Sequence, residues 1–484
     1  MIKTDFAMRK TVLTLTIASL CVSHLFAQDG LQVGTAEVDI SPTVFPIQLR
    51  SGKSDYVHDP LHVRAVAFQN EEGRAVIALV DAIGVGREWT DEAKAIAAEK
   101  TGWKMEEMMI SGTHTHTAPK GGDTSPGRIA YEKLRTEGLT EALIQAIESL
   151  EPAQVGFASD EEPTEVRNRR WITEEGKEAI NPLGLKDKVK TNGGVADKIG
   201  PAGPTDPEVC VIYAQTRKRK PLGLIANYAL HYVGNIPKVV EDDGRVVGMA
   251  SADYFGEFAR LMPFRVGGSN PPENFVAMMT NGTSGDINNL TFNITRAPRA
   301  PWEQVQQVAT KAADAAWRAT RKIENFDQKP LVATRQREVA LNYREPSHAQ
   351  LEKAMELMKL TAKQRNEINS RTTGMATNTI KYASPEMPES ESVLIQAFRI
   401  GDQAVVSMPF EVLVEIGLEI KEKSPFPHTF IIELANGGYG YLPPPNQHKL
   451  GGYETWLGTA RFAEDSSVIL TKHLLEMLEE LRAL

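Results

Sequence analysis

Short apolar segments alternate with amphipathic segments along most of the chain. Segments rich in Val, Ile, Leu and Ala predict β-strands. These are residues 31–40, 63–68, 75–80, 108–110, 155–157, 208–215, 222–230, 275–279, 393–400, 404–408 and 429–435. Other segments repeat apolar side chains at helical spacing. These are residues 90–100, 138–150, 251–261, 302–323, 348–370, 412–423 and 466–484. Because strands and helices alternate without a repeat or a clear linker, the pattern predicts one large α/β domain over residues 28–484, with layered mixed β-sheets flanked by helices.

Residues 172–205 differ from this pattern. They are rich in Gly, Pro and Lys and show little periodicity. A connection of this length without regular structure usually has a function. We therefore predict a long loop or a partly mobile lid.

The first 27 residues predict a secretory signal peptide. Basic residues precede an apolar run over residues 11–27, which ends at the small residue Ala27. A membrane anchor is disfavoured because the apolar run is short and His24 interrupts it. Cleavage near Ala27 would export the protein to the periplasm or the medium.

Composition narrows the functional classes further. Of the 484 residues, 41% are hydrophobic and 24% are charged, which is typical of a globular protein with a full core. The formal net charge of −9 disfavours nucleic acid as a partner. Loss of the signal peptide would also remove Cys21 and leave Cys210 alone, so no intramolecular disulfide is possible. Cys210 lies in an apolar strand segment and is predicted to be a buried structural thiol.

Two histidines directly follow the predicted strand at 108–110. In an extended chain, His114 and His116 would place both imidazoles on one face. Neutral imidazole is the commonest protein ligand of zinc, so this pair is a candidate metal site. The pair alone is equally compatible with a polar loop that carries two solvated histidines.

Polar, chemically active residues follow several other predicted strands. In α/β folds, ligands bind beyond the carboxyl ends of strands. One such residue is usually incidental, but several in one chain predict a shared site. The residues are Asp81, His114, His231, Asp286 and Tyr441.

The segment around the two histidines resembles a known family. Ser111–Pro119 (SGTHTHTAP) is similar to the S-G-T-H-T-H-S-G-P segment of neutral ceramidases, which are zinc amidases that cleave the N-acyl bond of ceramide. Further segments resemble the family in the same order, from about Gly34 onward. They are Asn168-Arg169 (family N-R-S), Asn227-Tyr228-Ala229-Leu230-His231 (N-F-A-V-H), Ser251-Ala252-Asp253 (S-x-D), Pro409-Phe410-Glu411 (P-G-E), and Tyr441 with Tyr453, which have the family's separation of twelve residues.

The resemblance implies a zinc ion held by four side chains, His114, His231, Glu411 and Tyr441. Two imidazoles, a carboxylate and a tyrosine oxygen suit zinc and leave room for water. Zinc can lower the pKa of a coordinated water to about 7. His116 would then be an acid/base group beside the metal.

The resemblance also implies that Arg169 and Tyr453 stabilise the oxyanion of a tetrahedral intermediate. Each assignment has a structural alternative. Arg169 could belong to a solvated charge cluster, and the two tyrosines could simply pack. His231 could be a core histidine, and Glu411 could begin the helix that follows it.

One departure from the family changes the expected chemistry. The family's G-D-V-S-P-N segment corresponds to residues 285–290, and Asn288 replaces the family's active-site serine. An asparagine cannot be an activated nucleophile, although its amide can donate to an oxyanion. We therefore expect direct attack by zinc-activated water, with no acyl-enzyme. The family's C-terminal β-sandwich domain also has no counterpart, so we expect a catalytic domain only.

The sequence thus predicts an exported zinc-dependent hydrolase that cleaves the amide bond of ceramide or another N-acyl compound. The substrate would be a small or lipid-like molecule, so peripheral contact with a membrane surface stays open, as do the oligomeric state and a second metal such as calcium. Two alternatives remain. One is a zinc-dependent esterase or lactonase, and the other is a non-catalytic zinc-bearing binding protein.

Overall fold

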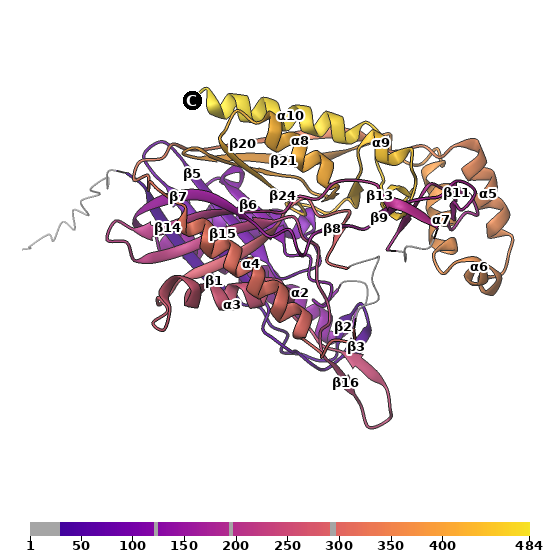
Figure 1. Cartoon of the computed structure of the whole chain (residues 1–484), viewed down its shortest axis with the longest axis horizontal. Coiled ribbons are helices and arrows are strands. Elements are labelled where there is room, and N and C mark those ends of the chain that lie inside the picture. Colours follow the sequence, from indigo (N-terminus) through magenta and orange to yellow (C-terminus); the bar gives the residue numbers. More distant parts are fainter. Residues whose placement is uncertain (1–29, 121–123, 193–196, 291–296) are drawn as a thin grey trace, which may run out of the picture.

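Two β-sheets stacked face to face form the centre of the molecule, and helices cover both outer faces (Figure 1). The computed structural model describes residues 30–120, 124–192, 197–290 and 297–484. The predicted signal peptide at 1–27 lies outside these residues. The four layers, helix, sheet, sheet and helix, confirm the prediction of mixed sheets flanked by helices.

The larger sheet has eight strands in the order β18-β15-β14-β7-β1-β4-β5-β6. β15 pairs with β18 and β5 pairs with β6 in parallel, and the other pairs are antiparallel. The carboxyl ends of the two parallel pairs carry the loops that contain His114 and His231. The strands are β1 (Gln32–Asp39), β4 (His62–Gln69), β5 (Arg74–Val80), β6 (Met108–Gly112), β7 (Glu151–Glu161), β14 (Glu208–Thr216), β15 (Pro221–Tyr228) and β18 (Val276–Asn281).

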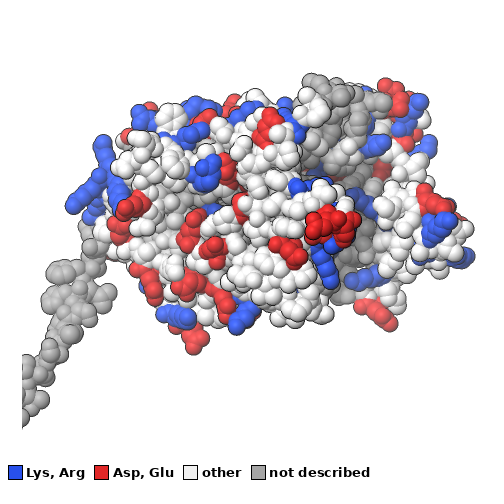
Figure 2. Space-filling view, turned by 90° about the horizontal axis from the view of Figure 1, so that it is seen from below, with Lys and Arg blue, Asp and Glu red and all other residues white. Residues whose placement is uncertain are grey.

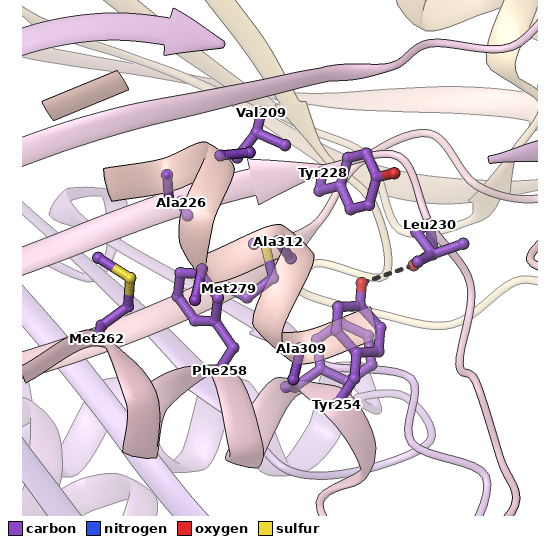
Figure 3. Close-up of a cluster of buried hydrophobic side chains, with 14 of the residues drawn as sticks. Val209, Ala226, Tyr228, Leu230, Tyr254, Phe258, Met262, Met279, Ala309 and Ala312 are labelled. Carbon is purple, nitrogen blue, oxygen red and sulfur yellow. Dashed lines mark hydrogen bonds between the residues drawn. The ribbon is translucent and has the colours of Figure 1, made fainter. Parts of the chain in front are cut away.

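Two pairs of helices cover the outer face of this sheet. The helices are α1 (Arg87–Thr101), α2 (Pro126–Glu148), α3 (Asp253–Gly267) and α4 (Glu303–Arg321). Apolar side chains of α3 and α4 pack on β14, β15 and β18 in one buried cluster (Figure 3). Within it, the Tyr254 hydroxyl donates to the carbonyl oxygen of Leu230 at 3.0 Å. This hydrogen bond fixes the backbone directly before His231.

The smaller sheet has four strands in the order β20-β21-β22-β24. Its inner face packs on the larger sheet, as shown by a core cluster that combines Phe398 and Phe430 with Val66 and Ile225. Its outer face is covered by α8 and α10. The elements are β20 (Val332–Asn342), β21 (Ser390–Ile400), β22 (Gln403–Ser407), β24 (His428–Ile432), α8 (Val414–Lys423) and α10 (Ser466–Arg482).

Short elements form the surroundings of the site. The helices α5 (His348–Met358), α6 (Ala362–Ile368) and α7 (Thr372–Tyr382) form a separate group at one end of the molecule (Figure 1). The others are β2 (Ile47–Leu49), β3 (Gly52–Ser54), β8 (Arg167–Asn168), β9 (Arg170–Thr173), β10 (Ala179–Ile180), β11 (Lys186–Asp187), β12 (Val189–Thr191), β13 (Lys198–Pro201), β16 (Lys238–Val240), β17 (Val246–Gly248), β19 (Ile287–Asn288), β23 (Glu411–Val412), β25 (Tyr441–Leu442), α9 (Pro445–His448) and the 3₁₀ turns Met105–Glu107 and Tyr453–Thr455.

Three element predictions are wrong. The helix predicted over 348–370 is divided between α5 and α6, because the Thr361 side chain accepts a hydrogen bond from the Gln364 backbone and begins a new helix. The loop predicted over 172–205 contains β10 to β13, and β12 and β13 flank β9 in a three-stranded sheet. The helix predicted over 138–150 begins earlier, at Pro126, after an N-cap at Ser125.

Cys210 is buried on β14, as predicted, and is a free thiol. In the part of the chain that the structure describes, the helices lack the length and apolar character needed to cross a membrane.

Candidate functional site

The eight site residues predicted from the sequence line one cavity of about 570 Å³. They come from the loops after β6 and β15, from the pair β23 and β25, and from the segments around β8, β19 and the 3₁₀ turn at Tyr453. These elements belong to different parts of the fold, and only the tertiary structure brings them together. The residues are His114, His116, Arg169, His231, Asn288, Glu411, Tyr441 and Tyr453.

Backbone carbonyl groups orient the two histidines predicted as metal ligands. Nδ1 of His114 donates to the carbonyl oxygen of Ile83 at 2.6 Å, and Nδ1 of His231 donates to that of Ser284 at 3.1 Å. In the neutral rings, Nε2 therefore carries a lone pair. The two Nε2 atoms are only 3.1 Å apart, and each also has an N–H group nearby: Nε2 of His116 lies 3.1 Å from that of His114, and Nη1 of Arg169 lies 3.4 Å from that of His231. Two imidazole lone pairs this close together are a donor arrangement that a metal ion accepts.

Glu411 and Tyr441 enter the same space from a short parallel strand pair. β23 and β25 place these two residues opposite each other. Oε2 of Glu411 is 3.4 Å from Nε2 of His114, and it is buried without a hydrogen-bond donor among the described residues. Burial raises the pKa of Glu411, but the neighbouring His114, Tyr441 and Arg169 together lower it below its usual value. An ionised, buried oxygen without a donor is typical of a metal ligand.

His116 has the opposite proton arrangement. The Arg50 guanidinium contacts Nδ1 of His116 at 2.8 Å, and because a guanidinium can only donate, Nδ1 must accept. The neutral ring then carries its proton on Nε2, which lies 3.1 Å from Nε2 of His114. The ring of Tyr232 stacks on His116 at 3.6 Å. Burial, His114 and Arg50 all lower the pKa of His116 and keep the ring neutral.

The donor set fits a metal ion. His114, His116 and His231 form the one group of three or more His, Cys, Asp or Glu side chains, within the described residues, whose donor atoms all lie within 4.8 Å of one another. The hydrogen bonds divide this group. His114 and His231 present lone pairs, whereas His116 presents an N–H. With Glu411 and Tyr441, the first two supply the mixed nitrogen and oxygen ligands that zinc accepts.

Arg169 is a buried residue in an ion-pair network, not part of a solvated cluster. Its Nη2 donates to the Tyr441 hydroxyl at 3.0 Å, and its Nη1 lies 3.4 Å from Nε2 of His231. Its Nε donates to fully buried Glu454 at 2.9 Å, and Arg170 donates to the same carboxylate at 2.8 Å. Burial raises the pKa of Glu454, but the two guanidinium groups more than offset this and lower it below its usual value.

Asn288 lines the cavity from β19. The backbone N–H of Leu290 donates to its Oδ1 at 3.3 Å, which leaves the amide NH₂ for another acceptor. The nearby Ser284 does not replace the family's serine. Its hydroxyl donates to Glu433 at 2.6 Å and lies behind His231, away from the cavity.

Tyr453 contacts the ring of Tyr441, one of the predicted metal ligands. Its ring is 5.5 Å from the ring of Tyr441, and the guanidinium of Arg371 lies 4.3 Å from the Tyr453 ring centre. Burial raises the pKa of Tyr453, and Glu411 raises it further. The phenol therefore keeps its proton and can donate a hydrogen bond into the cavity.

Two of the five strand-end residues predicted to share the site do not line the cavity. Asp81 is fully buried and forms an ion pair with Arg64 at 3.0 Å. Asp286 accepts hydrogen bonds from the backbone of Val414 at 2.9 Å and from the side chain of Asn168 at 2.7 Å. Both carboxylates bind groups from other segments of the fold. These structural contacts account for the two acids at strand ends, and neither acid lines the cavity.

Sequence reasoning missed several residues of the site. Tyr232 directly follows His231, and Glu454 directly follows Tyr453. Their positions next to predicted site residues were a signal by which they could have been predicted. Arg50, Arg371 and Glu433 lie far from every motif, and the sequence gives no signal for them.

Comparison with solved structures identifies the fold. The chain is similar to the crystal structure of neutral ceramidase from Pseudomonas aeruginosa, with a TM-score of 0.68 and 16% identity over 94% of this chain and 75% of that chain. It is similar to a ceramidase complexed with C2, with a TM-score of 0.67, 15% identity and the same coverage. No protein-family model and no curated protein sequence matches the chain. The chain therefore has the neutral ceramidase fold.

Proposed function

We propose that this protein is a zinc-dependent hydrolase that cleaves the amide bond of N-acyl compounds. The observation that carries this proposal is the convergence of Nε2 of His114, Nε2 of His231 and the donor-free oxygen of Glu411 at one end of the cavity. The fold of a ceramidase supports the choice of an amide as the substrate. The resemblance of the site segments to that family supports it independently of the fold.

In this proposal, each side chain of the site has a separate role. His114, His231, Glu411 and Tyr441 would hold zinc, which supplies a Lewis acid for the substrate carbonyl and activates water near neutral pH. The buried Arg169 is already oriented by Glu454 and points its guanidinium at this group.

Three donors would stabilise the oxyanion that forms when water attacks the carbonyl. Arg169, the Tyr453 phenol and the Asn288 amide line the cavity and each has a proton to donate. His116, which is neutral at the start, would take up the proton that the attacking water releases and pass it to the leaving amine, so that the ring begins and ends neutral. None of the described residues that line the cavity is a serine, which supports attack by water without an acyl-enzyme.

Metal analysis and a substrate screen test the proposal together. The purified protein should contain about one zinc per chain, because the four proposed ligands form one ordinary zinc site. His114→Ala should remove the metal, whereas the exposed histidine variant His348→Ala should retain it. His116→Ala should also retain it while losing turnover. A protein that binds no metal and hydrolyses no N-acyl substrate would refute the proposal, and loss of zinc in His116→Ala would refute the assigned ligand set.

The same screen separates the alternatives. Zinc chemistry acts on ester and amide carbonyls alike, so ester and lactone substrates are included; hydrolysis of these alone would identify an esterase or lactonase. The non-catalytic alternative, which is motivated by Asn288 in place of a serine, predicts bound zinc without turnover of either class.

We also propose that the protein is exported, on the evidence of the basic and apolar residues at 1–27. Expression of the full chain in a bacterial host, followed by fractionation and N-terminal sequencing, tests this. Export should produce an N-terminus near Gln28.

A further inference from the structure

The cavity is more positive than the rest of the protein. The whole chain has a net charge of −9, and Lys and Arg are interspersed with Asp and Glu over the face in Figure 2. Among the described residues, the cavity lining has two acidic residues, Asp187 and Glu411, but four cationic ones. The four are Arg50, Arg169, Lys190 and Arg371.

Three of these cations lack a carboxylate partner. Arg169 is neutralised by Glu454, but Arg50, Lys190 and Arg371 form no ion pair within the described residues. The two acidic groups of the lining do not compensate them. Glu411 faces the histidines, and the carboxylate of Asp187 accepts hydrogen bonds from Asn181 at 3.2 Å and from Trp456 at 2.7 Å.

Arg371 is held at the outer part of the cavity. It lies between α6 and α7, where the Asn369 side chain accepts a hydrogen bond from the Arg371 backbone N–H at 2.9 Å. Arg371 is exposed, its guanidinium lies over the Tyr453 ring at 4.3 Å, and its N–H groups have no acceptor among the described residues. A guanidinium held this way is suited to binding an oxyanion.

The cavity also limits the size of the substrate. Its volume of about 570 Å³ is typical of a pocket that holds one small ligand. Apolar side chains of Ile180, Val189 and Trp456 line it near Lys190. This volume suits one acyl chain with a small polar end.

We propose that the substrate carries an anionic group that binds Arg371. The substrate class would be single-chain N-acyl compounds with a carboxylate or phosphate on the amine part, such as N-acyl amino acids, and not neutral ceramide. This inference rests on the proposed amide hydrolysis for the position of the scissile bond. It goes further by assigning substrate selection to Arg371, a residue on the helical group that the sequence motifs do not include.

Four matched substrates test the proposal on the zinc-loaded protein. N-dodecanoylglycine carries a carboxylate, and N-dodecanoylglycinamide is its neutral equivalent. N-dodecanoyl-O-phosphoethanolamine carries a phosphate, and N-dodecanoylethanolamine is its neutral equivalent. We expect kcat/KM to be about tenfold higher for the anionic member of at least one pair, and the pair that shows the preference identifies the oxyanion. The preference should shrink as salt is added.

Variants then assign the preference to one residue. Arg371→Gln should raise KM for the preferred anionic substrate about tenfold more than for its neutral equivalent, and Arg371→Lys should restore part of the difference. Lys363→Gln is the matched control, because it removes an exposed cation from α6 outside the cavity.

Two results would overturn the inference. One is equal turnover of anionic and neutral substrates by the unchanged protein. The other is an equal loss for both in Arg371→Gln, which would mean that Arg371 only supports the Tyr453 ring.

If no amide is hydrolysed, the proposed function fails, and calorimetric binding of the same four compounds decides the inference separately. Charge-selective binding that Arg371→Gln abolishes would support it, and binding without charge preference would refute it.

Discussion

At the scale of single residues, Asn288 determines which chemistry is available. It lies on β19 with its Oδ1 held by the backbone of Leu290, so its NH₂ group is the part that can reach a substrate. A serine at this position could form an acyl-enzyme, whereas an amide can only donate a hydrogen bond. In the proposed mechanism, Asn288 leaves the nucleophilic role to water and contributes to oxyanion binding.

Asn288→Ala should lower kcat by about 10²-fold, because removal of one oxyanion donor typically has an effect of this size. Zinc content should not change, since Asn288 is not among the proposed ligands. Steady-state kinetics on an N-acyl substrate, with metal analysis of the same preparation, measure both quantities. Asn288→Asp should be at least as impaired, because a carboxylate would repel the oxyanion. Turnover at the original rate in the alanine variant would exclude the oxyanion role.

The sequence predicts site residues where a motif marks them. The segment at 111–119 marks His114 and His116, and the fold then places all eight predicted residues around one cavity. The sequence does not distinguish the roles of the two histidines by itself. That difference depends on Arg50 and on the carbonyl of Ile83, which are contacts made by distant parts of the chain. Such contacts leave no pattern in the local sequence.

At the scale of elements, the turn between β18 and β19 positions Glu411. The backbone N–H of Gly285 in this turn donates to the carbonyl oxygen of Val412 at 2.8 Å. The approach is so close that a Cβ atom on Gly285 would lie 2.7 Å from the carbonyl oxygen of Glu411. Only glycine allows this contact. The turn therefore packs directly against the backbone of β23, the strand that carries the proposed ligand Glu411.

Gly285→Ala should therefore displace the Glu411 backbone, weaken zinc binding and lower the free energy of unfolding by about 1–3 kcal/mol. Gly374→Ala on α7 is the matched control, because a Cβ there meets no atom within 4 Å and alanine favours a helix. Zinc titration and urea unfolding of both variants measure the effects. If Gly285→Ala bound zinc as tightly as the unchanged protein, the turn would not position Glu411.

Sequence patterns predicted several long elements well, although the strand β20 was not predicted and α2 begins earlier than predicted. β1, β14 and α4 bury a continuous apolar face, so the pattern repeats often enough to be recognised. Strands of two or three residues such as β8 and β23 contain too few positions to show any period. Their pairing is decided by tertiary contacts, and three such strands, β19, β23 and β25, carry the site residues Asn288, Glu411 and Tyr441.

At the scale of the whole molecule, the proposed metal site joins the two halves of the fold. His114 and His231 follow strands of the larger sheet, whereas Glu411 and Tyr441 lie on the pair β23 and β25, which is connected in sequence to β22 and β24 of the smaller sheet. Nε2 of His114 lies 3.1 Å from Nε2 of His231 and 3.4 Å from Oε2 of Glu411. An ion bound by these atoms would link the two sheets.

Removal of zinc should therefore lower the stability of the whole fold. A ligand at a hundred times its dissociation constant adds about 2.7 kcal/mol to the free energy of unfolding when it binds only the folded state. We expect chelation to lower the urea midpoint with little change in slope, and added zinc to restore it. His114→Ala should already have the lower midpoint and should respond weakly to chelator or zinc. Since the ligands come from both sheets, the loss should appear in one cooperative transition followed by far-UV circular dichroism and tryptophan fluorescence. A midpoint that stays constant while metal analysis shows complete loss of zinc would mean that the ion does not join the sheets.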